Sequence, residues 1–298
     1  MNLKKWLEIS ICQAVFLALG SGAVNAAQAA APTYLDARDR ALTEQRIVQE
    51  SQGKRAVFFG EFHDNKILHK AELSLLKKLY AVYGSRLVLS LEMLEADEQA
   101  AVDAYLAGKL TEGQYLQQAR QWPNYKTDYR PLVEFAREKK LKVLAANVPR
   151  NLASILAKTG SLEAVKEKDR SYLPRTTTAP DGAYKEKFYA TMAANGKAMP
   201  VPPAMRERFF RAQCLKDDKM AETIGDYLTG HPDAVVYHVN GCFHSDSRLG
   251  TVERLQARLP ETKFLVLSPF KGTIENWQQQ GRPVYGDVIV CTGEALKK

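Results

Sequence analysis

The sequence has few cysteines and no C-x-x-C pair. Its four cysteines among 298 residues are Cys12, Cys214, Cys242 and Cys291. The missing C-x-x-C spacing argues against a zinc ribbon and against a thioredoxin-type redox motif. Cys12 belongs to an N-terminal segment that we expect to be removed. The spacing of the other three leaves open whether two of them form a disulfide in an oxidising compartment.

The sequence also has no dense basic segment. It contains 42 Lys and Arg against 34 Asp and Glu, which gives a formal net charge of +8. This moderate excess favours anionic ligands or surfaces, but no basic run carries interleaved aromatic residues. We therefore expect no nucleic-acid partner.

Long apolar segments are missing except near the N-terminus. Two lysines there precede a mostly apolar stretch, residues 9–19, which is too short to span a bilayer comfortably. Small residues in a small-x-small order follow, which is typical of a signal-peptide cleavage site. We predict a signal peptide over residues 1–29, cleaved after Ala26 or Ala29, with an uncleaved anchor as the alternative.

The mature chain, residues 30–298, is therefore predicted to be an exported, soluble protein that is periplasmic or secreted. Ile11 stands before Cys12, where a lipoprotein signal has a small residue, so lipidation of this cysteine is not expected. The composition, with 45% hydrophobic and 26% charged residues, is typical of an ordinary globular protein.

Short apolar runs alternate with amphipathic segments along the mature chain. Buried strands are predicted over residues 56–60, 86–91, 142–146, 234–239 and 263–267, and an edge strand over residues 283–291. Helices are predicted over residues 35–52, 67–83, 97–106, 130–140, 204–228 and 248–259. This order favours an α/β fold with a central, mostly parallel sheet flanked by helices.

Residues 171–203 interrupt this pattern. Three consecutive threonines are followed by a Pro-Asp-Gly turn, and three further prolines stand near the end of the segment. A helix over residues 184–194 fits between them. Because long irregular segments in compact domains often cover binding sites, we interpret residues 171–203 as a helical and loop cap insertion over the edge of the sheet.

Glu61, His63 and Asp64 directly follow the first buried strand, and His69 comes shortly after them. In open α/β sheets, ligands bind at the edge formed by the carboxyl ends of the strands. Glu61 and His63 would point to the same side of an extended segment, because side chains alternate along a strand. A carboxylate beside an imidazole suits metal ligation or acid–base chemistry.

Polar residues follow three further predicted strands in the same way. An apolar run ends at or just before each of these residues: Glu92, Asn147, and the pair Asn240 and His244. Parallel strands bring such ends to one edge, so we expect these side chains to converge. Two of the ends carry a Gly-x-x-His tetrapeptide, which is stronger evidence for a site than one such motif.

These motifs resemble the ChaN-like haem-binding family, within the Tiki/TraB and erythromycin-esterase-like superfamily. The five signatures are GEFHDN at 60–65 with His69, LEM at 91–93, AANVPR at 145–150, FRAQCLKD at 210–217, and GCFH at 241–244. The resemblance implies a ChaN-like haem-binding α/β domain over residues 30–298. The cofactor-binding residues that it implies are Glu61, His63, Asp64, His69, Glu92, Asn147, Arg150, Gln213, Asp217 and His244.

By this resemblance, the protein is an exported haem-binding protein involved in haem and iron uptake or handling. Its expected partners are haem, a second copy in a homodimer, and outer-membrane haem or iron uptake machinery. His or Tyr holds the iron in haem carriers, and spacing does not choose between them. Arg150 stands beside a strand end and a helix start, so it is a better candidate than Arg206 to bind a haem propionate. The candidate tyrosines lie in a loop over residues 122–129 and in the segment 171–203, and they are Tyr125, Tyr129, Tyr172, Tyr184 and Tyr189.

The wider superfamily implies a second function for the same polar cluster. Glu61, His63, Glu92 and His244 would then hold a divalent metal ion in a metal-dependent hydrolase or peptidase built on the paired Gly-x-x-His motifs. A third interpretation is a polar network that only holds the strand ends together.

The N-terminal segment leads to a first testable prediction. Protein isolated from intact cells should begin at Ala27 or Ala30, because the small-x-small sites precede these residues. Mass spectrometry of the intact protein measures this end directly. A full-length product retained in the cytoplasm would contradict export.

Overall fold

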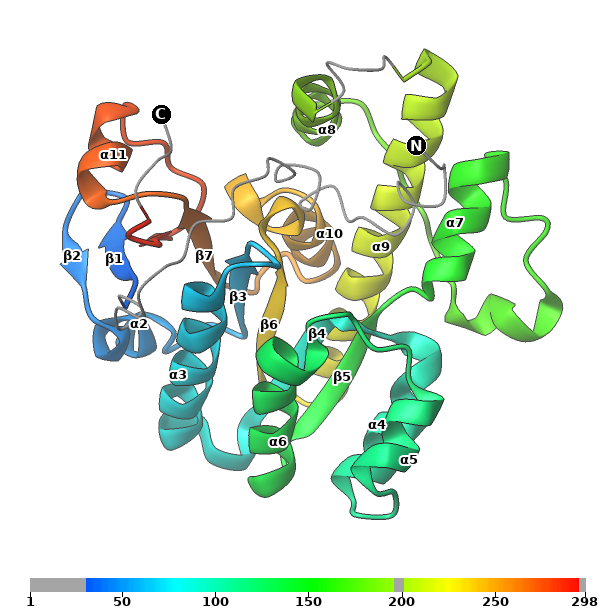
Figure 1. Cartoon of the computed structure of the whole chain (residues 1–298), viewed down its shortest axis with the longest axis horizontal. Helices are drawn as coiled ribbons and strands as arrows, with labels where there is room; N and C mark the ends of the chain where they lie inside the picture. The colour runs from blue at the N-terminus through cyan, green and yellow to red at the C-terminus, as the bar shows by residue number, and fades with distance from the viewer. Residues whose placement is uncertain (1–30, 196–200, 295–298) are drawn as a thin grey trace, which may run out of the picture.

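A single mixed sheet with helices on both faces organises the chain (Figure 1). The computed structural model describes residues 31–195 and 201–294, so the predicted signal peptide lies outside the described residues. Among those described, no helix combines the length and the apolar character that crossing a membrane requires.

The sheet has eight strands in the order β2-β1-β8-β7-β3-β6-β4-β5. The six strands from β8 to β5 run parallel to their neighbours, whereas β1 pairs antiparallel with both β8 and β2. The prediction of an α/β fold with a mostly parallel sheet is therefore confirmed. The strands are β1 Thr33–Asp36, β2 Ala41–Leu42, β3 Ala56–Glu61, β4 Leu87–Glu95, β5 Lys142–Asn147, β6 Val235–Gly241, β7 Phe264–Phe270 and β8 Val288–Cys291.

Most helices connect consecutive strands. They are α2 Glu44–Glu50, α3 Lys66–Tyr83, α4 Gln99–Leu106, α5 Glu112–Gln118, α6 Arg130–Glu138, α7 Arg150–Thr159, α8 Ala183–Asn195, α9 Pro203–Gly230, α10 Thr251–Arg258 and α11 Ile274–Gln279. Short turns of other helix types include the π-helix η4 Tyr125–Tyr129 and the 3-10 helices η3 Ala96–Glu98 and η6 Cys242–His244. Asn65 begins α3, since its side chain accepts hydrogen bonds from the backbone N–H groups of Ile67 and Leu68.

Alternate residues of β3 face opposite layers of the molecule. Val57 and Phe59 pack with α3 and α6, whereas Phe58 packs with α9 and α10, and all three side chains are fully buried. Figure 1 shows α3 and α6 on the near face of the sheet and α9 and α10 behind it. A central strand buried on both faces explains the continuous apolar run in the sequence.

The N-terminal part of the described chain differs from the sequence prediction. Residues 35–52 were expected to form one helix, but this part forms β1, β2 and only the short helix α2. Because β1 pairs with β8, β8 is an interior strand and not the predicted edge strand. The backbone groups along an exposed β8 would lack partners, and β1 supplies them from the other end of the chain.

Helix α8 lies within the predicted cap and sits beyond the carboxyl ends of the strands (Figure 1). Tyr184 and Phe188 of α8 pack against Phe210 of α9 and against Phe243, which follows β6. Helix α8 of the predicted cap is therefore anchored to the edge of the sheet by aromatic contacts.

No disulfide joins the remaining cysteines of the described chain. Cys214, Cys242 and Cys291 are all buried, on α9, on η6 and at the end of β8. The possibility of one disulfide, left open by the sequence, is therefore not realised in this structure.

Candidate functional site at the carboxyl edge of the sheet

The two Gly-x-x-His segments follow neighbouring strands. β3 and β6 pair in parallel, with Gly60 opposite Asn240 and Glu61 opposite Gly241. The other neighbour of β6 is β4, which carries Glu92. This register brings the polar residues from three adjacent strands to the same edge of the sheet, where open α/β sheets bind ligands.

Glu61 and His63 form a buried cluster with Tyr129 of η4. Nδ1 of His63 lies 2.6 Å from Oε1 of Glu61, and the Tyr129 hydroxyl donates to the same oxygen at 2.7 Å. These three side chains are at most 3% exposed. The half-buried ring of Trp122 packs on the His63 ring, with 4.7 Å between centroids. The imidazole is therefore held by both a carboxylate and an aromatic contact.

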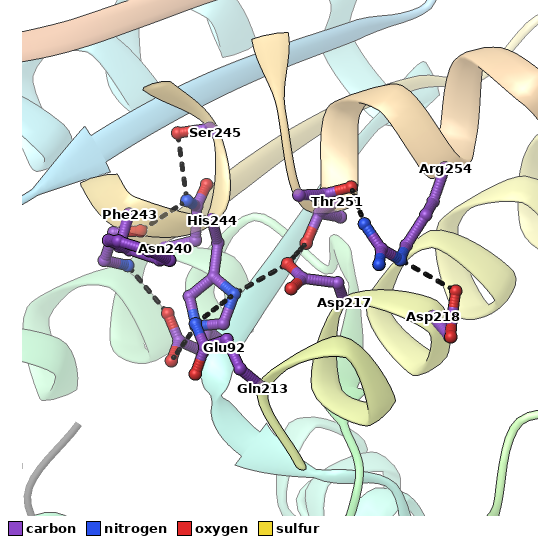
Figure 2. A network of polar contacts seen from close by, with 12 residues as sticks. Glu92, Gln213, Asp217, Asp218, Asn240, Phe243, His244, Ser245, Thr251 and Arg254 are labelled. Carbon is purple, nitrogen blue, oxygen red and sulfur yellow. Dashed lines mark hydrogen bonds and ion pairs between the residues drawn. The ribbon is translucent and has the colours of Figure 1, made fainter. Parts of the chain in front are cut away.

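His244 lies between two carboxylates, as Figure 2 shows. Its Nε2 is 3.3 Å from Oε1 of Glu92, and its Nδ1 is 2.7 Å from Oδ1 of Asp217. Asp217 also accepts hydrogen bonds from the hydroxyls of Thr251 at 2.8 Å and Tyr184 at 2.5 Å. Tyr184 belongs to α8, so this cluster connects the cap to the strand ends.

The two clusters meet at Gly241. The backbone N–H of Gly241 donates to Oε2 of Glu92 at 2.7 Å. A Cβ atom added to Gly241 would lie only 2.6 Å from Nε2 of His63, so the imidazole rests directly against the glycine backbone. The glycine of the second Gly-x-x-His motif is therefore needed for space, because any side chain would displace the histidine of the first motif.

Opposite charges stabilise the cluster around His244. Burial by itself lowers the pKa of His244, but the charges of Glu92 and Asp217 outweigh burial and raise the pKa to about 10. Burial raises the pKa of Glu92, but attraction to His244 outweighs it and lowers the pKa to about 2. At neutral pH the cluster thus holds an imidazolium between carboxylates, and each charge offsets the desolvation of the others.

His238, inside β6, shows the opposite behaviour. Burial lowers the pKa of His238 to about 3, and its Nδ1 lies 2.9 Å from the hydroxyl oxygen of Ser90. Two buried histidines close in sequence therefore carry different charges at neutral pH, because only His244 contacts carboxylates directly.

Other residues expected at the site fall into three groups. His69 joins the first cluster, with Nδ1 3.0 Å from Oε2 of Glu61, and Gln213 joins the second, with its side-chain amide 3.1 Å from Nε2 of His244. Asp64 is exposed. Asn147 and Arg150 lie at the end of β5, where Arg150 forms an ion pair with Glu95 and not with either cluster.

Sequence reasoning missed several members of the two clusters. Glu72 on α3 contacts His69 at 3.2 Å, and its position three residues later on the same helix was an available signal. Thr251 at the start of α10 and the backbone N–H of Gly241 carried no signal, because they reach the clusters only through tertiary packing. Tyr129 and Tyr184 were considered only as candidate haem ligands, but in the structure they donate to buried carboxylates.

Comparison with known proteins identifies the family of the chain. Residues 47–255 match the family model described as haem-binding uptake, Tiki superfamily, ChaN. The chain belongs to the ChaN family. Among curated proteins, no relative matches the chain.

Two solved structures resemble the ChaN-family chain described here. One, titled "Cofacial heme binding to ChaN of Campylobacter jejuni", is 16% identical with a TM-score of 0.68, and the match covers 87% of this chain and 96% of that one. The other is an erythromycin esterase mutant in its open conformation, 13% identical with a TM-score of 0.48, over 80% of this chain and 77% of that one. The first likeness shows that the fold is shared, and the second is too small to support an argument.

The close approach at Gly241 predicts a sensitive position. Gly241→Ala should lower the free energy of unfolding by about 1–3 kcal/mol, because the new methyl group overlaps the His63 imidazole. Urea denaturation measures the change. Gly113→Ala is the matched control, since a Cβ there meets nothing within 4 Å. Equal stability of the two variants would contradict the described packing.

The raised pKa of His244 predicts a charged imidazole above neutral pH. Nitrogen NMR at pH 8 should show His244 protonated on both nitrogens and His238 neutral, since their pKa values are about 10 and about 3. The folded state binds the His244 proton more tightly than the unfolded state, whose pKa is near 6.5. The stability from this group is complete below about pH 6.5 and is lost as the pH rises through about 10. A His244 ring that titrates near 6.5 would contradict the ion-paired arrangement.

Proposed function

We propose that the mature protein binds haem and takes part in haem and iron uptake or handling outside the cytoplasm. The observation that supports haem binding is the match of residues 47–255 to a haem-binding family, together with a fold shared with a haem-binding ChaN. The signal-peptide features of residues 1–29 support export. A second copy of the chain and outer-membrane uptake machinery are the partners expected for such a protein.

Burial argues against four of the five histidines as the iron ligand. His63, His69, His238 and His244 are at most 5% exposed, and three of them contact buried carboxylates. A haem approaching from solvent would have to displace these contacts first. His231 is exposed, but it precedes β6 and therefore lies at the edge of the sheet opposite to the cap. Tyrosine is another side chain that holds haem iron in proteins, so we infer a tyrosine ligand.

The tyrosines of the two loops differ in exposure. Tyr125, Tyr129 and Tyr184 are buried, whereas Tyr172 and Tyr189 are half-buried. Only the two half-buried phenols offer their oxygen near the surface, so they are the better candidates among these five.

The surroundings of Tyr189 match the needs of haem. The guanidinium carbon of Arg206 lies 5.3 Å from the ring centroid of Tyr189, and Nζ of Lys185 lies 5.8 Å from it. Two cations are therefore close enough to pair with the propionates of a haem bound at Tyr189. Phe209, which is partly buried, packs in the same aromatic cluster and adds apolar surface. The Tyr189 hydroxyl donates to Glu207 at 2.7 Å. Tyr189 would hold the iron, and haem would bring its own redox and electron-transfer chemistry.

The buried clusters serve this proposal by positioning the cap. Tyr184 and Tyr189 both lie on α8, and Tyr184 donates to Asp217, which in turn holds His244 at the end of β6. The strand-end clusters therefore fix the orientation of the helix that presents Tyr189.

A haemin titration tests this function. The mature protein should give a saturable change in the Soret band. Tyr189→Phe should weaken haemin binding at least tenfold, or about 1.4 kcal/mol, because the iron loses its ligand. Absence of any saturable change in the wild-type protein would refute haem binding itself.

Tyr125→Phe is the matched control. The Tyr125 side chain is buried and belongs to η4, not to α8, so the change removes the same phenol oxygen from a tyrosine that lies outside the cap. Haemin affinity should stay unchanged in this variant. Equal affinities for Tyr189→Phe and the wild type would leave haem binding in place and exclude Tyr189 as the ligand.

A further inference from the structure

Glu61, His69 and Glu72 form a compact group that haem binding does not use. Each offers a ligand atom, and these atoms lie within 4.8 Å of one another. Nδ1 of His69 is 3.0 Å from Oε2 of Glu61 and 3.2 Å from Oε2 of Glu72. Both glutamates are 0% exposed and His69 is 5% exposed. We call these three residues the β3–α3 triad.

The His69 ring is oriented as in many metal sites. Its Nε2 lies 3.1 Å from the backbone carbonyl oxygen of His63, so Nε2 carries the proton and donates it to that oxygen. Oδ2 of Asp128 lies 3.6 Å from the same nitrogen. Nδ1 then faces the two carboxylates. A histidine that binds a metal through one nitrogen commonly donates its other N–H to a carbonyl or carboxylate.

The two glutamates of the triad are also positioned to offer oxygen atoms to a bound ion. Oε1 of Glu61 accepts from Tyr129 and contacts His63, while Oε2 of Glu61 faces Nδ1 of His69 at 3.0 Å. No other described residue donates a hydrogen bond to Oε1 of Glu72, which belongs to the carboxyl group beside Glu61. Buried carboxylate oxygens normally accept from a donor, so Oε1 of Glu72 is open to a cation.

Two carboxylates buried side by side need positive charge. Burial and the charge of Glu61 raise the pKa of Glu72 well above its usual range. Burial lowers the pKa of His69, but Glu72 and Glu61 outweigh it and raise the pKa to about 12. Two adjacent buried carboxylates repel each other unless positive charge lies between them. A divalent cation beside Glu61, His69 and Glu72 would supply that charge.

We propose that the β3–α3 triad binds a divalent transition-metal ion through Nδ1 of His69 and one carboxylate oxygen each from Glu61 and Glu72. One imidazole and two carboxylates suit zinc or manganese, whose bonds to such atoms are about 2.0–2.2 Å long. Mg²⁺ prefers oxygen ligands and keeps several waters, which a buried site with a histidine does not favour. This site differs from the set Glu61, His63, Glu92 and His244 that the paired motifs suggest.

Calorimetric titration with Zn²⁺ tests the proposal. The mature protein is first treated with a chelator and then equilibrated with Zn²⁺ or Mg²⁺. We expect one zinc ion per chain and no binding of Mg²⁺. Glu72→Gln should weaken zinc binding at least about 100-fold, because it removes a ligand. This variant should fold, since glutamine has the same shape as glutamate and a buried neutral amide needs no counter-charge.

Two further variants make the result decisive. Glu222→Gln is the matched control, because Glu222 is a buried glutamate on α9 that contacts Lys219 and Arg175 and lies outside the triad. The zinc affinity of the Glu222→Gln variant should equal that of the wild type. Glu92→Gln separates the two sets of ligands. If Glu92→Gln loses zinc and Glu72→Gln keeps it, or if the wild type binds none, the proposal is wrong. Circular dichroism confirms folding, and His69→Gln replaces Glu72→Gln if that variant unfolds.

The zinc result is independent of the proposed function. The β3–α3 triad is buried beside β3, whereas Tyr189 lies on the cap, and the haemin spectrum is recorded on the same samples without zinc. Loss of zinc binding with intact haemin binding, or the reverse, therefore identifies which proposal fails.

Discussion

Buried charge at the carboxyl edge of the sheet is the constraint on which the site depends. Glu61, Glu92, Asp217 and His244 are at most 1% exposed, so each would be strongly destabilising alone. The sheet register places acids and imidazoles within ion-pair distance, and these contacts offset the lost hydration. Removing one partner of such an ion pair leaves the other charge buried and uncompensated. The strand ends must therefore keep the acids and imidazoles in contact.

The same contacts connect separate parts of the molecule. His244 follows β6, Asp217 lies on α9 and Tyr184 lies on α8, and hydrogen bonds join all three. The first cluster likewise joins β3 to α3 and η4 through His69 and Tyr129. The strand ends are therefore held to the surrounding helices, including α8, by the same buried polar contacts.

Much of the site was predictable because parallel strands end at one edge. The sequence was sufficient to select Glu61, His63, Glu92 and His244, since each follows an apolar run. It did not select Glu72, because a single acidic residue on an amphipathic helix is usually solvated, nor Thr251, whose partner Asp217 is far away in sequence. It also placed Arg150 among the cofactor residues, and the structure adds that its guanidinium pairs with Glu95.

The sequence by itself determined the α/β class, the central strands and most helices. The spacing of apolar residues and the residues that begin and end helices are local properties of the chain. Only the tertiary structure decided that residues 33–36 pair with β8 and that His63 rests on the backbone of Gly241. It also decided which histidine is charged. A pKa depends on what lies within a few ångströms, and chain order does not specify such neighbours.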